Sequence, residues 1–138
     1  MSHRAEIQFP PPSPGTSPAD PSSIVVNHHR VPRVELRAEM LTGGHLYHLS
    51  LAGCVFNNIF RLAAERQIDI SRATVAADGE FDDEGSLGVT CEIELVGNVS
   101  DEELRKVAQD AAADSTIGAA IGKGAPVTLA EVRVSSSE

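Results

Sequence analysis

Residues 45 to 60 contain no Asp, Glu, Lys or Arg, and this stretch constrains the fold more than any other. Apolar residues recur in it every three or four positions, which predicts a helix from about His45 to Gln67 with Thr42 as its N-cap. The pattern comprises Leu46, Leu49, Ala52, Phe56, Ile59, Phe60 and Ala63. A helix with so little charge must be covered on more than one side, so we expect it at the centre of the molecule.

Alternating side chains before this helix predict a strand. Val34, Leu36, Ala38 and Met40 alternate with Arg33, Glu35, Arg37 and Glu39, which is typical of a half-buried strand. The segment SIVVNHH, residues 23–29, is a plausible partner strand, with Pro32 in the turn between the two. The two arginines could therefore simply belong to a solvated face, paired with the glutamates beside them.

The second half of the chain predicts a hairpin, two helices and a last strand. An Asp-, Glu- and Gly-rich turn separates the two hairpin strands, and Cys91 lies on the apolar face of the second strand, which predicts a core position. Ser100 and Glu103 form a capping box before a helix that ends near Ala113, and Asp114 or Ser115 caps a shorter one. Residues 127–134 form the last strand. The order β-β-α-β-β-α-α-β predicts an α+β fold with a mostly antiparallel sheet packed against helices.

Length and composition predict one domain with an N-terminal arm. A chain of 138 residues is long enough for one core, and six of its eight prolines fall in residues 10–21. We therefore expect residues 1–23 to form an extended or disordered arm and residues 24–138 to form the single domain.

Net charge and the absence of a targeting signal limit the expected partners and the expected compartment. The net charge of −9, without a basic cluster, argues against nucleic-acid or anionic-membrane partners. The N-terminal residues lack the apolar region of a signal peptide, so we expect a cytoplasmic protein. With two cysteines in a reducing compartment, a structural disulfide is not expected, whereas a reactive thiol is possible.

No segment of the sequence has the residue spacing of a common metal-binding or cofactor-binding motif. The acidic turn lacks the ligand spacing of a calcium loop, and IGAAIGKGA departs from the phosphate-loop spacing. His45 and His48 lie on adjacent helical turns, but Cys54 is about 600° of helix beyond His48, so three ligands do not converge. We expect no metal and no cofactor, and interpret the two histidines as first-turn residues facing solvent or a subunit interface.

Three segments together resemble a known family. GGHLYHLSLAGCVFNNIFRLAAERQIDI, followed by GVTCEIELVG and VSDEELRKVAQDA, is similar to the OsmC/Ohr family of osmotically inducible and organic-hydroperoxide-resistance proteins. The resemblance covers roughly residues 25–134. It implies thiol-dependent hydroperoxide reduction by an intertwined homodimer, with Cys54 in the position of the peroxidatic cysteine.

The resemblance also implies a cation beside that cysteine, because the thiolate is the reactive species. In the family an arginine before the central helix has this role, and a glutamate nine or ten residues ahead of the cysteine holds it. Gly44 and His45 occupy those two positions here, so His45 could at most replace part of the glutamate's role. Arg33 and Arg37 are the candidate arginines.

The family's resolving cysteine begins a Cys-Pro-Val-Ser motif, and Ser115 of STIG stands in its place. Serine cannot form a disulfide, and Cys91 could pair with Cys54 only if their Cα atoms came within about 7 Å. An external small thiol or dithiol would then recycle Cys54. The alternatives are a catalytically inactive homodimer that binds a small molecule in the pocket around Cys54, and a redox sensor whose oxidised Cys54 reports to a partner.

Overall fold

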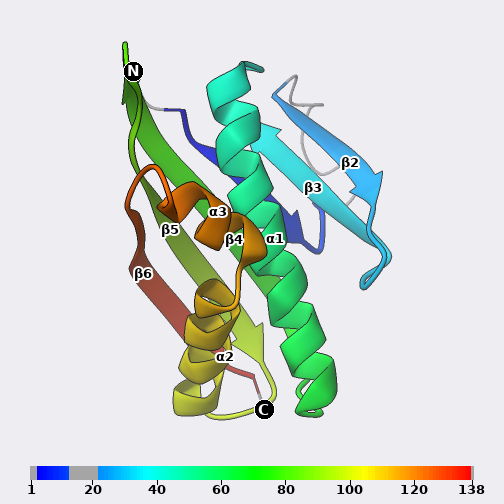
Figure 1. Cartoon of the computed structure of the whole chain (residues 1–138). Coiled ribbons are helices and arrows are strands. Elements are labelled where there is room, and N and C mark those ends of the chain that lie inside the picture. The colour runs from blue at the N-terminus through cyan, green and yellow to red at the C-terminus, as the bar shows by residue number, and fades with distance from the viewer. Residues whose placement is uncertain (1–2, 13–21, 138) are drawn as a thin grey trace.

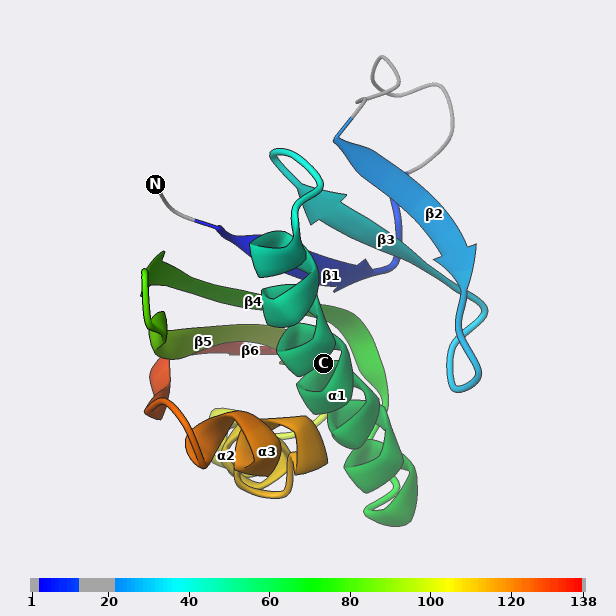
Figure 2. The same cartoon turned by 45° about the horizontal axis from the view of Figure 1, so that its top comes forward.

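The computed structural model describes residues 3–12 and 22–137. Within these ranges it contains one six-stranded sheet and three helices, and the helices lie on the same face of the sheet (Figures 1 and 2). The predicted α+β class is therefore confirmed. Residues 13–21, which hold part of the proline-rich arm, lie outside the described residues.

The strands are β1 (Ala5–Phe9), β2 (Ser23–Asn27), β3 (Arg33–Ala38), β4 (Ile70–Asp82), β5 (Gly85–Gly97) and β6 (Val127–Ser136). Their order in the sheet is β2-β3-β1-β4-β5-β6. Only β5 and β6 pair in parallel, so the sheet is mostly antiparallel, as predicted.

The helices are α1 (Gly43–Glu65), α2 (Asp101–Ala113) and α3 (Thr116–Gly122). Thr42 caps α1 by accepting a hydrogen bond from the backbone N–H of His45, and the capping box of Ser100 and Glu103 starts α2. Both starts were predicted from local sequence signals. One face of α1 packs on the sheet, and α2 and α3 cover its adjacent flank (Figure 2). The predicted central helix is confirmed.

Strand β1 corrects the expected domain boundary. Residues 5–9 fall within the stretch that we expected to be an arm outside the domain, yet they form an interior strand between β3 and β4. Ala5 and Ile7 are buried against the core. The reason is long-range pairing, because both edges of this short segment are satisfied by strands far away in the sequence.

The β4–β5 hairpin forms as predicted. The carboxylate of Asp82 accepts hydrogen bonds from the backbone N–H groups of Glu84 and Gly85, and Gly85 adopts φ +132° at the turn. Cys91 is a core residue, with 2% of its surface exposed. Val89, Ile93 and Leu95 are buried on the same face.

Helix α1 ends in a Schellman motif with an unusual residue at its left-handed position. Gln67 has φ +57°, the N–H of Ile68 donates to the carbonyl of Ala63, and the N–H of Gln67 donates to that of Ala64. Glycine adopts this conformation without the steric cost that a Cβ atom brings.

Replacing Gln67 by glycine should therefore raise the free energy of unfolding by about 1 kcal/mol. Ala64→Gly, in an ordinary helical position of the same turn, is the matched control and should lower it by about 1 kcal/mol. Urea denaturation followed by circular dichroism measures both values. Destabilisation by both substitutions would contradict the strain at Gln67.

Candidate functional site

Cys54 lies near the middle of α1, and its side chain is partly exposed. Nine residues of helix turn through about 900°, so Cys54 projects from the side of α1 opposite to His45, about 13 Å further along the axis. His45 faces the sheet and is buried. The thiol is thus on the outer side of a helix whose other side forms the core.

One flank of Cys54 is uncovered. A Cβ atom added to Gly53 would meet no neighbouring heavy atom within 4 Å in the described part of the chain. Leu46, two turns earlier on this side of the helix, is 50% exposed. A small molecule or a second protein chain can therefore approach the thiol from this flank.

The flank of α1 on the other side of Cys54 is hydrogen-bonded to the end of α2. Asn58 donates from Nδ2 to the carbonyl oxygen of Ala111 at 3.1 Å, and Arg61 donates to the carboxylate of Asp114 at 3.2 Å. Arg61 lies seven residues after Cys54 and so on the same face of the helix, about 10 Å along it. Sequence reasoning missed this cation, although its seven-residue spacing from Cys54 could have revealed it.

Ser115 is buried and serves as the N-cap of α3. Its hydroxyl accepts a hydrogen bond from the backbone N–H of Gly118 at 2.9 Å. A Cβ atom on Gly118 would lie 3.4 Å from Leu51, which is one helical turn before Cys54. The residue in the resolving position therefore lies beside the α1 segment that carries Cys54, and its hydroxyl has a structural role.

Alternation along β3 separates Arg33 and Arg37 from the side of the strand that faces the core. Val34 is buried in the core beneath α1, and the alternation along β3 places both arginines on the opposite face of the sheet. Arg37 lies 3.8 Å from the carboxylate of Glu35. Glu35 is itself buried, so this face is not simply the solvated surface that the alternation allowed.

The interpretation of His45 and His48 as residues facing solvent or an interface is wrong for this chain. They are 2% and 0% exposed, because the start of α1 packs on β1 and β4. Burial, together with the nearby His3 and His48 rings, lowers the pKa of His45 from its ordinary value. His45 is thus a buried, desolvated group on the side of α1 away from Cys54.

Cys91 is chemically unlike Cys54. Burial and the neighbouring Glu92 carboxylate raise the pKa of its thiol to about 12. Cys91 lines an apolar cavity of about 230 Å³ together with Leu51 and Val55 of α1. Both cysteines are free thiols in the structure.

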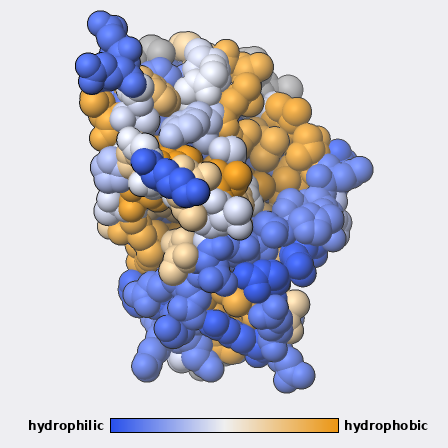
Figure 3. All heavy atoms as spheres, in the orientation of Figure 1, coloured by the Kyte–Doolittle hydropathy of each residue, from blue (hydrophilic) through white to orange (hydrophobic). Residues whose placement is uncertain are grey.

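An exposed apolar surface lies beside the first half of α1. It is a groove of about 400 Å³ between α1 and strands β2 and β3, with Arg37 and Glu39 on its border. Leu41 is 77% exposed there, and apolar atoms gather in this upper part of the molecule (Figure 3). We call this groove the apolar surface; its apolar members are Ile24, Leu36, Ala38, Met40, Leu41, Leu46 and Leu49.

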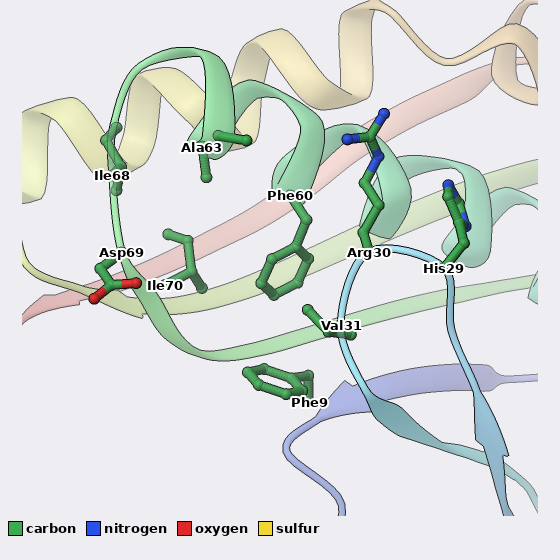
Figure 4. Close-up of a pocket in the computed structure, with 10 residues that line it drawn as sticks. Phe9, His29, Arg30, Val31, Phe60, Ala63, Ile68, Asp69 and Ile70 are labelled. Atoms are coloured by element: carbon green, nitrogen blue, oxygen red, sulfur yellow. The ribbon is translucent and has the colours of Figure 1, made fainter.

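A second cavity, of about 660 Å³, lies at the other half of α1. Phe9, Val31 and Phe60 point toward one another at its base, while His29 and Arg30 rise from the β2–β3 turn beside α1 (Figure 4). The rings of Phe9 and Phe60 meet edge to face at 5.5 Å. The lining can accept an apolar molecule with a polar or anionic group, but Cys54 is not part of it.

The described residues, 3–12 and 22–137, contain neither a cluster of metal ligands nor a membrane-spanning helix. No group of three or more His, Cys, Asp or Glu side chains in these ranges could hold a metal ion. None of the helices in these ranges is long and apolar enough to span a membrane.

Comparison with known proteins identifies the family. Residues 37–130, more than half of the chain, match the family described as OsmC-like protein. The chain belongs to the OsmC-like family. No match was found among curated protein sequences.

Solved structures share the OsmC-like fold. A hypothetical protein from Aquifex aeolicus has 10% identity and a TM-score of 0.62, over 88% of this chain and 94% of that one. An OsmC-like protein from Mycoplasma pneumoniae has 10% identity and a TM-score of 0.59, over 89% and 99%. A candidate osmotic stress induced and detoxification response protein from Psychrobacter arcticus has 16% identity and a TM-score of 0.56, over 87% and 99%. At such identities the likeness establishes the fold alone.

The different environments of the two cysteines predict selective alkylation. Iodoacetamide at pH 7.5 should modify Cys54 in the native protein, whereas Cys91 should react only after unfolding, because its thiol is buried and has a pKa of about 12. Peptide mass spectrometry over time measures both rates. The Cys54→Ser variant is the control and should show no modification before denaturant is added. Equal rates at the two thiols would contradict this assignment.

Proposed function

We propose that this OsmC-like protein reduces organic hydroperoxides with Cys54 as its single peroxidatic cysteine and with an external small thiol or dithiol as reductant. The main support is the accessibility of Cys54, on the central helix of a fold whose family includes peroxidases. Cys91 is a poor substitute, since it is buried and its pKa is about 12. We place the reaction in the cytoplasm, where small thiols are abundant.

The reaction needs one thiolate and two reducing thiols. The Cys54 thiolate attacks one oxygen of the hydroperoxide, the O–O bond breaks, and the alkoxide takes a proton and leaves as an alcohol. Sulfur is oxidised to a sulfenic acid. A first external thiol then displaces water to form a mixed disulfide, and a second thiol releases Cys54 and carries away the disulfide.

A homodimer completes this proposal. We infer that Arg33 or Arg37 of one chain reaches the Cys54 of a second chain, because the alternation along β3 puts both arginines opposite Val34, which packs beneath α1. Arg37 borders the apolar surface, which a second copy would bury. We therefore favour Arg37 over Arg33 as the cation that stabilises the partner's thiolate, while the buried His45 supports the start of α1.

Peroxide consumption tests the role of Cys54. The native protein should consume cumene hydroperoxide in excess dithiothreitol, Cys91→Ala should keep this activity, and Cys54→Ser should fall to the rate of buffer alone. Dimedone labelling with mass spectrometry should find the sulfenic acid on Cys54. A Cys54→Ser variant as active as the native protein would exclude the proposed chemistry. Stoichiometric sulfenic acid without turnover would instead indicate a sensor.

Arginine variants separate the two candidate cations. Arg37→Gln should slow the oxidation of Cys54 about tenfold or more, because losing a nearby cation disfavours the thiolate. Arg33→Gln is the matched control on the same strand and should change the rate less. Stopped-flow measurement of the first turnover isolates this step from reduction by dithiothreitol.

The apolar surface predicts the effect of charge on assembly. The native chain should be a dimer, and Leu41→Glu together with Leu46→Glu should make it monomeric, because the interface would have to bury two carboxylates. Leu87→Glu is the control, since Leu87 is 58% exposed and lies near the β4–β5 turn, outside this surface. Light scattering after size exclusion gives the masses. A native monomer would rule out the proposed arrangement.

A further inference from the structure

Three histidine rings meet where the chain enters β1. His3 lies two residues before the start of this strand, and its ring centroid lies 5.2 Å from that of His45 and 6.3 Å from that of His48. Phe81 of β4 closes the cluster, with its ring edge to face on His3 and stacked on His48. His45 and His48 are buried and His3 is partly buried, so a charge within this cluster would be costly.

The peptide groups of His3 are held from two sides. Nδ1 of His48 donates to the carbonyl oxygen of His3 at 2.7 Å, which requires the proton to be on Nδ1, because a carbonyl can only accept. The backbone N–H of His3 donates to the carboxylate of Asp78 at 3.1 Å. Helix α1 and strand β4 therefore both fix the residue that leads into β1.

Two ring nitrogens of the cluster are buried with no hydrogen-bond partner in the described part of the chain, namely Nε2 of His48 and Nδ1 of His3. Because Nδ1 of His48 carries the proton, Nε2 of the neutral ring is bare. An N–H group at this nitrogen would likewise have no acceptor in the described part of the chain.

The third ring is coupled to the start of α1. Nδ1 of His45 lies 2.6 Å from the Thr42 hydroxyl, and the same oxygen caps the helix by accepting from the His45 N–H. Protonated Nδ1 would donate to that oxygen and change the hydrogen bonding of the cap. The carboxylates of Glu39 and Asp78 favour the charged ring, whereas burial and the other two imidazoles oppose it.

We propose that His3, His45 and His48 form a pH-sensitive latch, which holds β1 in the sheet while His45 is neutral and releases it when His45 is protonated. β1 lies between β3 and β4 (Figure 2). Its release would remove one hydrogen-bonded neighbour from each of these two strands. The latch needs no hydroperoxide and no second subunit, so it stands apart from the proposed peroxidase activity.

The direction of the pH effect follows from His45. Burial first, and then the His3 and His48 rings, lower its pKa below the unfolded value, so the released segment binds the proton more tightly than the latched one. The latch is at full strength above about pH 6.5, the ordinary value for histidine, and weakens as the pH falls below it.

Hydrogen exchange of the full chain tests the latch. Exchange of backbone amides in residues 5–9, corrected for the intrinsic pH dependence, should report at least about tenfold more opening at pH 5.0 than at pH 7.5. Amides of α2, which is distant in the sequence and makes no contact with the cluster, should change less. Equal opening of β1 at both pH values would overturn the proposal.

Two variants identify the titrating groups. His28→Gln with His29→Gln removes the other two histidines of the chain and should keep the acid-induced opening. His45→Gln should reduce it to less than about threefold. If His45→Gln does not fold, NMR titration of the native protein decides: the His45 ring should titrate below pH 6.5, in step with the loss of β1 amide protection. Loss of the effect in the His28 and His29 variant would refute the latch.

Discussion

The burial of α1 is the constraint on which the rest of the structure depends. Its first two-thirds carry no charge, so water is a poor environment for most of its circumference. The sheet covers one face, and α2 and α3 cover the adjacent flank. The strip that includes Leu46 and Gly53 stays uncovered, and Cys54 borders it. The chemistry proposed for the thiol and the proposed dimer both follow from this uncovered strip.

Local signals made much of the fold predictable. Thr42 and the Ser100–Glu103 capping box marked where the helices begin, and the Asp82–Gly85 turn marked the hairpin. Strand β1 could not be found in this way, because AEIQF is short and is followed by prolines. Its two partners, β3 and β4, begin 24 and 61 residues after Phe9. Only pairing with them makes this segment a strand. The strand order of the sheet depends on the same long-range pairing.

The candidate site was predictable in its residue types and much less in its geometry. The burial of Cys91 and the helix start at Ser115 agree with expectations from alternation and capping, whereas the partial exposure of Cys54 was not predicted. The burial of His45 does not agree with expectation, because it depends on His3 and Phe81. These two residues lie before and after α1 in the sequence. Alternation did put Arg33 and Arg37 opposite Val34, but it could not show that Glu35 between them is buried.

Coverage and access place opposite demands on the strip beside Cys54. Burying the apolar surface favours a second chain packed closely on α1. In the proposed reaction an external thiol must reach the oxidised sulfur, because Ser115 stands where the family has a resolving cysteine and serves as a helix cap. A dimer that sealed the strip would allow one oxidation and no recycling. Gly53 can satisfy both requirements, because its missing side chain leaves room beside the thiol. Leu46, two turns earlier on α1, and Leu41, just before the helix, supply the apolar contact. The proposed interface should therefore be centred on the start of α1 and bring an arginine of the second chain to one side of Cys54, while the Gly53 side stays accessible.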